Sequence, residues 1–193
     1  IKEVNVISLL NHAAIVKIYG YCLKDFDNKN NQVIIMENVP NGDLQDVIDE
    51  EANEFPREGW DRTQKLITLY GIASGMAYSV SYGITHSDLK PLNILMTDDL
   101  FPKITDFDSA RMEADSNRQI FNLSGDEMYS VIYSAPEVFL QSDNHLKNAE
   151  KSDVYSFAII IYQIFTLKTP FEHLSDAMIV GKVAKGKRPK IPD

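Results

Sequence analysis

The stretch HSDLKPLN at residues 86–93 decides the fold of this chain. It holds the carboxylate of Asp88, the ammonium of Lys90 and the amide of Asn93 within eight positions. A second stretch, TDFDSAR at residues 105–111, adds further carboxylates. Both lie in a region where short apolar runs alternate with polar loops, so the sequence predicts that these polar groups gather in loops rather than in a packed core.

A predicted hairpin would join the two stretches. The runs NILM at 93–96 and KIT at 103–105 have strand-like composition and are separated by the turn-forming TDDLFP. Asn93 would then enter one strand and Asp106 would follow the other. An amide oxygen beside a carboxylate is a hard-oxygen site that suits Mg²⁺.

Asp88 and Lys90 complete a chemical set. In such a hairpin Asp88 would lie within reach as a general base, and Lys90 would supply a cation for phosphate. A base, a phosphate-binding cation and oxygen ligands for a metal are the groups that phosphoryl transfer requires, because that reaction depends on positioning and charge neutralisation.

Length and charge limit the function classes. The chain has 193 residues, enough for one domain or most of a larger one, and its 44% hydrophobic and 24% charged content is ordinary for a globular protein. The formal net charge of −9 argues against a nucleic-acid partner and against nonspecific binding to an anionic membrane. The one basic run, KGKRPK at 185–190, is interpreted as a solvated loop.

The single cysteine and the apolar segments bear on location. Cys22 is alone, which fits a reducing compartment and predicts a cytoplasmic protein, and we expect it to be a small buried side chain. The start of the chain has no signal-peptide pattern. The longest apolar run, residues 154–167, is shorter than the about 20 residues of a membrane span, so it predicts a buried helix and no membrane segment.

The remaining pattern indicates a β-containing start followed by helices. The predicted elements are a helix over 1–10, strands over 14–23 and 32–37, a short helix beginning at Leu44, a loop over 49–61, and helices over 62–82, 153–167 and 174–184. The helix over 62–82 carries an apolar stripe that we expect to face the core, formed by Leu66, Leu69, Tyr70, Ala73, Ala77 and Val80. Residues 109–132 are polar and irregular.

Several segments resemble eukaryotic protein kinases. HSDLKPLN is similar to the catalytic loop H-R-D-L-K-x-x-N, and DFD at 106–108 is similar to D-F-G. SAPE at 134–137 resembles A-P-E, and SDVYSFA at 152–158 resembles a further family segment. GKRPKIP at 186–192 is similar to a segment common in the tyrosine-kinase-like group of Ser/Thr kinases. The resemblance covers essentially the whole chain in order and spacing.

The resemblance implies an α+β, protein-kinase-like two-lobed fold. Residues 1–39 would be the remnant of a small β lobe, from helix C through the hinge, and residues 40–193 a mostly helical large lobe without its last helices. It also implies ATP-dependent phosphoryl transfer with Mg²⁺ to Ser/Thr hydroxyls of protein substrates, in signal transduction. Regulatory partner proteins are a further expectation.

Carried over residue by residue, the resemblance assigns catalytic roles. Asp88 would orient and deprotonate the substrate hydroxyl, and Lys90 would neutralise the γ-phosphate. Asn93 and Asp106 would hold Mg²⁺. Ser130 takes the place of a Thr that contacts the catalytic Asp and Lys in the substrate platform, and it supports the Ser/Thr type together with Lys90.

The resemblance also implies a nucleotide site. Glu3 would be the helix-C glutamate, Met36 the gatekeeper, and Glu37 to Val39 the hinge that meets adenine. Leu95 would pack beneath the adenine ring. A hydrophobic column linking the lobes would be anchored at its base by Asp153, and its members would be Ile7, Ile18, His86 and Phe107.

A second family shares part of the pattern. Small-molecule kinases of the aminoglycoside and choline type also carry H-x-D-x-x-x-x-N followed by D-[FW]-[DE], and Ser87 and Asp108 fit that pattern better. Lys90 and the segments SAPE and SDVYSFA favour the protein-kinase interpretation instead.

The chain departs from the protein-kinase pattern in ways that bear on activity. Ser87 replaces the Arg of H-R-D, so we expect no activation through phosphorylation of 109–132, and Asp108 replaces the Gly of D-F-G. No Gly-rich loop or V-A-I-K-type lysine precedes Glu3, and the arginine that normally pairs with Glu137 is missing. We therefore expect residues 1–193 alone to be marginally stable and nearly inactive. The alternative hypothesis is a pseudokinase or interaction module.

Overall fold

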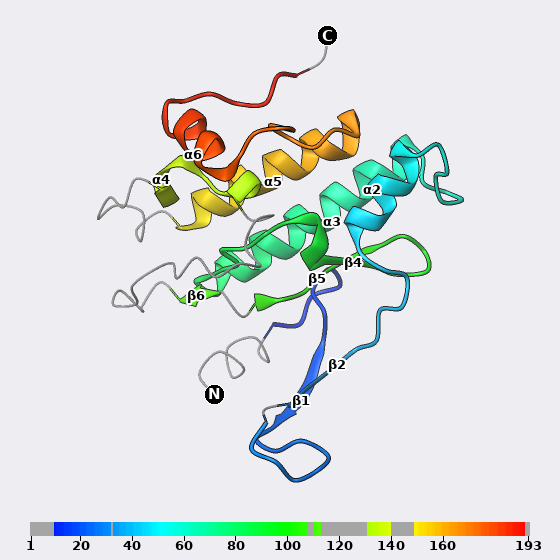
Figure 1. Ribbon diagram of the computed structural model, residues 1–193. Helices are drawn as coiled ribbons and strands as arrows, with labels where there is room; N and C mark the ends of the chain where they lie inside the picture. Colours follow the sequence, from blue (N-terminus) through cyan, green and yellow to red (C-terminus); the bar gives the residue numbers. More distant parts are fainter. Residues whose placement is uncertain (1–9, 32, 108–109, 113–130, 140–148, 192–193) are drawn as a thin grey trace.

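The computed structural model describes residues 10–31, 33–107, 110–112, 131–139 and 149–191. A small pair of strands projects from one end of a larger helical body, and α6 lies on the opposite side of that body (Figure 1). The elements are β1 (Ile18–Cys22), β2 (Val33–Met36), α2 (Leu44–Ala52), α3 (Arg62–Ser81), β3 (Ile84–Thr85), η1 (Pro91–Asn93), β4 (Ile94–Met96), β5 (Pro102–Ile104), β6 (Arg111–Met112), η4 (Val131–Tyr133), α4 (Pro136–Phe139), α5 (Ala149–Thr166) and α6 (Asp176–Ala184). The expected combination of a small β region and several helices is confirmed, whereas the helix predicted over 1–10 lies outside the described residues except for Leu10.

Strands β1 and β2 form the predicted antiparallel pair, with Ile18 opposite Met36 and Cys22 opposite Val33. The strand predicted from residue 14 begins only at Ile18, because residues 14–16 form backbone hydrogen bonds with β5 instead of with β2. Cys22 is exposed rather than buried as predicted, since β1 and β2 form a two-stranded sheet by themselves and cannot enclose both of its faces.

Helix α2 is longer than predicted and occupies the start of the expected loop over 49–61. Its capping box explains where it begins: the Asp46 N–H donates to the Asp43 carboxylate (3.0 Å), and the Asp43 N–H donates to the Asp46 carboxylate (3.1 Å). Leu44, Val47 and Ile48 are buried on one face, as predicted.

Helix α3 buries a different face from the predicted one. Leu69 is buried, but Leu66, Tyr70, Ala73, Ala77 and Val80 are exposed. The buried face carries the glycines instead, because β5 packs directly on the helix. A Cβ at Gly71 would lie 2.6 Å from Pro102 Cγ, and one at Gly75 would lie 2.9 Å from Ile104 Cδ1.

Helix α5 crosses the middle of the helical body and supplies much of its core, with Ile159, Ile160 and Ile164 buried. The prediction that this helix is apolar and buried all round is only partly right, since Val154 and Phe165 are exposed. α6 matches the amphipathic helix predicted over 174–184. Within the described part of the chain, every helix is too short or too polar to cross a bilayer.

Candidate active site

The predicted hairpin is confirmed and joins the two sequence stretches that carry the candidate site. Strand β4 pairs antiparallel with β5, with Ile94 opposite Ile104. One step beyond this pair, the Thr105 N–H donates to the Asn93 carbonyl at 3.0 Å. Asn93 and Asp106 therefore lie at the same end of the hairpin, next to its two adjacent strands.

Asp88 is at the centre of a polar cluster. Its Oδ2 accepts hydrogen bonds from Lys90 Nζ at 2.7 Å and from Asn93 Nδ2 at 3.1 Å. Asn93 Nδ2 also donates to the Asp88 carbonyl at 2.8 Å, so the amide nitrogen uses both of its protons on this one residue. The side chains of Asp88 and Lys90 are 24% and 16% exposed, respectively, so the carboxylate is held in place while part of it faces solvent.

Buried contacts to α5 hold this loop. Asp153 accepts the backbone N–H of His86 on Oδ2 (2.8 Å) and that of Ser87 on Oδ1 (2.9 Å). Ser87, the residue that replaces the family's Arg, has a positive φ of 68°, a strained conformation for a non-glycine residue that these bonds help to maintain. The predicted anchoring role of Asp153 is consistent with this geometry.

His86 connects the loop to the segment after β5. Its Nε2 donates to the Thr105 carbonyl at 2.9 Å, and its Nδ1 accepts the Asp88 N–H at 3.3 Å, which together specify the neutral Nε2–H tautomer. The His86 and Phe107 rings lie 4.7 Å apart. Two members of the predicted column thus touch, and Ile18 packs against the same core.

Asn93 and Asp106 have the donor chemistry that Mg²⁺ requires. Because Asn93 Nδ2 faces Asp88, its Oδ1 remains the acceptor of that side chain, and Asp106 is an exposed carboxylate with φ of 60°. In the described ranges, no three His, Cys, Asp or Glu side chains converge as a metal site. A cation here would be held by one amide oxygen and one carboxylate, with phosphate or water oxygens filling the remaining positions.

The predicted hinge follows β2. The Glu37 N–H donates to the Lys17 carbonyl, and the Glu37 carboxylate accepts the Lys17 N–H at 2.7 Å and Lys103 Nζ at 2.8 Å and 3.0 Å. Partial burial opposes ionisation of this carboxyl, but the hydrogen bonds and charges of Lys103 and Lys17 outweigh it, so the pKa of Glu37 is lowered. Met36 is 43% exposed and Val39 is partly buried.

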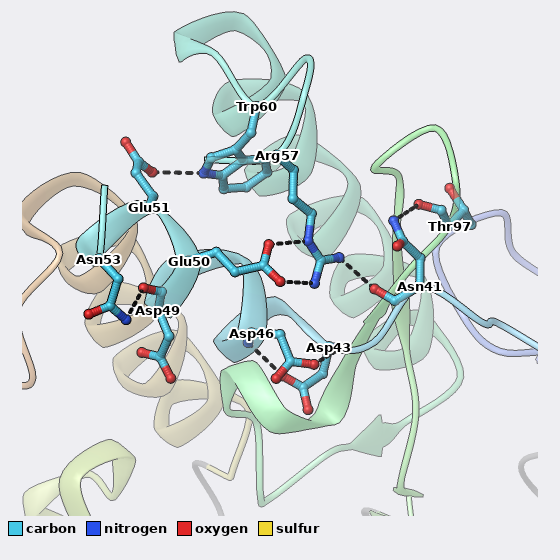
Figure 2. Close-up of polar contacts among 10 residues, drawn as sticks. All are labelled: Asn41, Asp43, Asp46, Asp49, Glu50, Glu51, Asn53, Arg57, Trp60 and Thr97. Carbon is cyan, nitrogen blue, oxygen red and sulfur yellow. Dashed lines mark hydrogen bonds and ion pairs between the residues drawn. The ribbon is translucent and has the colours of Figure 1, made fainter. Parts of the chain in front are cut away.

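A polar network at the start of α2 borders Leu95, which lies in β4 and forms an isolated bridge with Asp43. The Arg57 guanidinium lies between the Glu50 carboxylate and the Asn41 carbonyl (Figure 2). It donates to the carboxylate oxygens at 2.5 Å and 3.0 Å and to the carbonyl at 2.6 Å. Burial raises the pKa of Asp43, and the nearby Asp46 carboxylate adds to the effect, although the Asp46 N–H opposes it. Sequence reasoning missed Asp43, which the capping pattern GDLQD could have revealed.

The segment after the predicted substrate platform is also tied to α5. Ser156 Oγ donates to the Tyr133 carbonyl at 2.8 Å, and the Tyr133 hydroxyl donates to Gln163 Oε1 at 2.5 Å. Glu137, for which we expected a missing arginine, accepts the Ser152 hydroxyl at 3.1 Å. The remaining predicted positions lie outside the described residues, namely Glu3, Ile7, Asp108 and Ser130.

The geometry thus brings together a held carboxylate and an adjacent ammonium, and it places two side chains with hard oxygen atoms at the same end of the hairpin, as phosphoryl transfer would require. The chain belongs to the protein kinase family, because residues 1–193 match the family model described as protein tyrosine and serine/threonine kinase. This match confirms the family resemblance and the kinase fold, and it favours the protein-kinase interpretation over the small-molecule one.

Individual relatives are also kinases. The chain is 31% identical over 188 residues to human "Cytoplasmic tyrosine-protein kinase BMX", covering 97% of this chain and 26% of the relative. It is 31% identical over 191 residues to human "Ankyrin repeat and protein kinase domain-containing protein 1", covering 99% of this chain and 23% of the relative. It is 31% identical over 193 residues to a "Probable LIM domain-containing serine/threonine-protein kinase" of Dictyostelium discoideum, covering 99% and 27%. The chain spans about a quarter of the length of these relatives.

Proposed function

We propose that this protein is a Ser/Thr protein kinase that transfers the γ-phosphoryl group of ATP to hydroxyls of protein substrates. One observation carries the proposal: Asp88 Oδ2 accepts hydrogen bonds from both Lys90 and Asn93, so the candidate base, the phosphate cation and a metal ligand form one connected cluster. Phosphoryl transfer depends on fixing such groups before the substrates arrive.

In the proposed mechanism, Asp88 accepts the proton of the substrate hydroxyl through its carboxylate and orients the oxygen for in-line attack. Lys90 Nζ, already bonded to that carboxylate, stabilises negative charge on the transferred group. Asn93 Oδ1 and Asp106 would hold Mg²⁺, whose chemistry when bound is to neutralise charge on the phosphate oxygens.

Nucleotide would bind between the hinge and β4. In the described part of the chain, no hydrogen bond uses the backbone N–H of Val39, which leaves it available to adenine. Met36 ends β2 beside this segment, and Leu95 is partly buried in β4 where the ring would rest. Glu37 and Lys103 fix the hinge from the other side, and Glu3 would complete the site from helix C.

The Ser/Thr preference rests on Lys90, two residues after the base, and on Ser130 in the sequence of the platform. Because the relatives include a tyrosine kinase, the preference needs a direct test. Two peptides that differ only in Ser or Tyr at the acceptor position should be phosphorylated unequally by the full-length protein, with Ser preferred. Equal rates, or a preference for Tyr, would contradict the assignment. Cytoplasmic location and a signalling role stay predictions.

The activity test compares wild-type protein with Asp88→Asn at full length, using labelled ATP, Mg²⁺ and a Ser-containing protein substrate. Loss of the general base should reduce transfer by about 10²–10⁴-fold, while ATP binding is retained. Asp98→Asn, at an exposed carboxylate in the β4–β5 turn, is the matched control and should leave the rate unchanged.

The same experiment tests the pseudokinase alternative, which the substitutions Ser87 and Asp108 favour. If wild-type protein binds ATP but transfers no more label than Asp88→Asn, the chain is a nucleotide-binding pseudokinase. If it neither binds ATP nor transfers label, the interaction-module reading holds.

A further inference from the structure

The end of α6 and the segment after it form a concentrated positive patch on a negatively charged chain. Five cations occupy nine positions, and all five residues are exposed: Lys182, Lys185, Lys187, Arg188 and Lys190. The whole chain has 19 Lys and Arg against 28 Asp and Glu, so the rest of it carries 14 cations and the same 28 anions. We call residues 182–190 the cationic segment.

The fold itself does not neutralise this segment. Among the described residues, none of its side chains forms an ion pair with a carboxylate. Arg188 is used structurally: its Nη1 donates to the carbonyls of Val183 (3.2 Å) and Lys187 (2.8 Å), and its guanidinium lies 5.1 Å from the Tyr155 ring centroid. The four lysines thus remain as like charges in solvent, a field that attracts anionic groups.

The cationic segment is attached to the elements that follow the predicted substrate platform. α6 packs against η4 and α4, and Val131, Ile179 and Val183 form one buried cluster. η4 begins at Val131, directly after Ser130 in the sequence. The positive charges therefore flank the part of the chain along which a protein substrate would lie.

One stretch of α5 connects all three parts. Asp153 accepts hydrogen bonds from two backbone N–H groups of the candidate catalytic loop, and Ser156 donates one to the Tyr133 carbonyl of η4. Between them, the ring of Tyr155 contacts the Arg188 guanidinium. These contacts come from three residues within four successive positions of one helix. The cationic segment is thus fixed relative to Asp88 by a rigid element, as a docking surface for a substrate must be.

We propose that the cationic segment docks an acidic, Asp- and Glu-rich segment of the protein substrate. This inference rests on the proposed kinase function and names the class of substrate. Exposed lysines with no paired carboxylate complement carboxylate side chains across an interface. A protein partner fits better than a nucleic acid, because the net charge of −9 would repel a long polyphosphate that extends beyond the cationic segment.

The test uses the full-length protein and two peptides with the same acceptor Ser, one joined to an Asp/Glu-rich tail and the other to a Gln/Ser tail. Wild-type protein should phosphorylate the acidic peptide with a kcat/KM about fivefold to tenfold higher, and 300 mM salt should reduce this preference. The triple variant Lys185→Gln/Lys187→Gln/Lys190→Gln should abolish the preference while phosphorylating the neutral peptide normally. The control variant Lys24→Gln/Lys151→Gln/Lys168→Gln, which removes three exposed lysines elsewhere, should keep it.

Binding of a fluorescent acidic peptide, measured by anisotropy, separates the two proposals. Binding that the triple variant loses, without transfer to any peptide, supports the docking surface and overturns the proposed activity. Transfer at equal rates to both peptides overturns the docking surface and leaves the activity standing. Tighter binding of a DNA oligonucleotide or of vesicles containing phosphatidylserine than of the acidic peptide also overturns it.

Discussion

The candidate catalytic loop at residues 86–93 and the β1–β2 pair differ in how deeply the residues that hold them are buried. His86 is 0% exposed and Asp153 is 4% exposed, and Asp153 accepts a buried hydrogen bond from His86 and a partly buried one from Ser87. In the β1–β2 region, by contrast, Phe26 is 96% exposed and Tyr19 is 64% exposed. The difference indicates that the part of the candidate site around Asp88 is fixed by the buried helical body. The predicted hinge depends instead on the partly exposed contacts of Glu37 with Lys17 and Lys103.

The two regions meet at β5. The Val16 N–H donates to the Ile104 carbonyl, and the Ile104 N–H donates to the Ala14 carbonyl, both at 2.8 Å. Lys103, between Ile104 and the turn, reaches Glu37 at the hinge. Strand β5, which ends near Asp106, is therefore also bonded to the proposed hinge, so a change in β5 is expected to affect both parts of the proposed nucleotide site.

The largest effect is expected where the catalytic loop meets α5. In Asp153→Asn, an NH₂ group replaces one of the two oxygens that accept the N–H groups of His86 and Ser87, so a buried donor faces another donor. We expect the free energy of unfolding to fall by about 3 kcal/mol. Urea denaturation of the purified protein measures this loss, and phosphoryl transfer should fall with it because the loop moves.

Asp176→Asn, in the first turn of α6, is the matched control, and we expect a change of less than about 1 kcal/mol, since a carboxylate near a helix N-terminus contributes little at the surface. If Asp153→Asn were no more destabilising than this control, the catalytic loop would not be held by α5, and the contrast between the two regions would fail.

The next effect is expected at the contact between α3 and β5. A Cβ at Gly71 would lie 2.6 Å from Pro102 Cγ and 3.2 Å from Cδ of the same ring, which cannot rotate away. Although Ala favours helices over Gly, Gly71→Ala should therefore lower the free energy of unfolding by about 1–3 kcal/mol. Thermal and urea denaturation both measure this change.

The substitution Gly181→Ala on α6 should change the free energy of unfolding in the opposite direction. Apart from the backbone of α6 and the two neighbouring residues, no atom of the described residues lies within 4 Å of a Cβ at that position. Only the helix propensity should therefore change, and the free energy of unfolding should rise by about 0.5–1 kcal/mol. Stabilisation by both substitutions would show that β5 does not pack on α3 as closely as described.

Local patterns predicted much of this fold correctly. The turn between NILM and KIT predicted the β4–β5 hairpin, and with it the proximity of Asn93 and Asp106. The turn before α2 and the amphipathic α6 were also predicted, because both depend on residues a few positions apart.

The predictions failed where a distant partner decides burial. The exposed stripe on α3 is a regular apolar pattern, yet the buried face is the one with Gly71 and Gly75, since only glycine admits β5 at that distance. The contacts of Asp153 with residues 86 and 87 span more than sixty positions. Their pairing could be expected from the family resemblance, but periodicity contains no such information.

The smallest effect is expected at the hinge and depends on pH. The pKa of Glu37 is lowered in the folded protein, so ionised Glu37 stabilises the fold above the ordinary value of about 4.5. This contribution is lost as the pH falls from 4.5 through the lowered pKa. Lys103→Met removes the largest favourable partner, so the decline in stability between pH 7 and pH 3 should become shallower by about 0.5–1 kcal/mol, as for other pairs near the surface.

A double-mutant cycle with Glu37→Gln isolates the pair, because the two single variants should each flatten the pH profile and the double variant should flatten it no further. Lys168→Met, at an exposed lysine after α5, is the control and should leave the profile unchanged. An equally steep profile in Lys103→Met would mean that the backbone N–H of Lys17, rather than the Lys103 ammonium, keeps Glu37 ionised. The proposed hinge would then be held by the residue that precedes β1, and the helical body would reach it only through the backbone bonds of Ile104 with Ala14 and Val16.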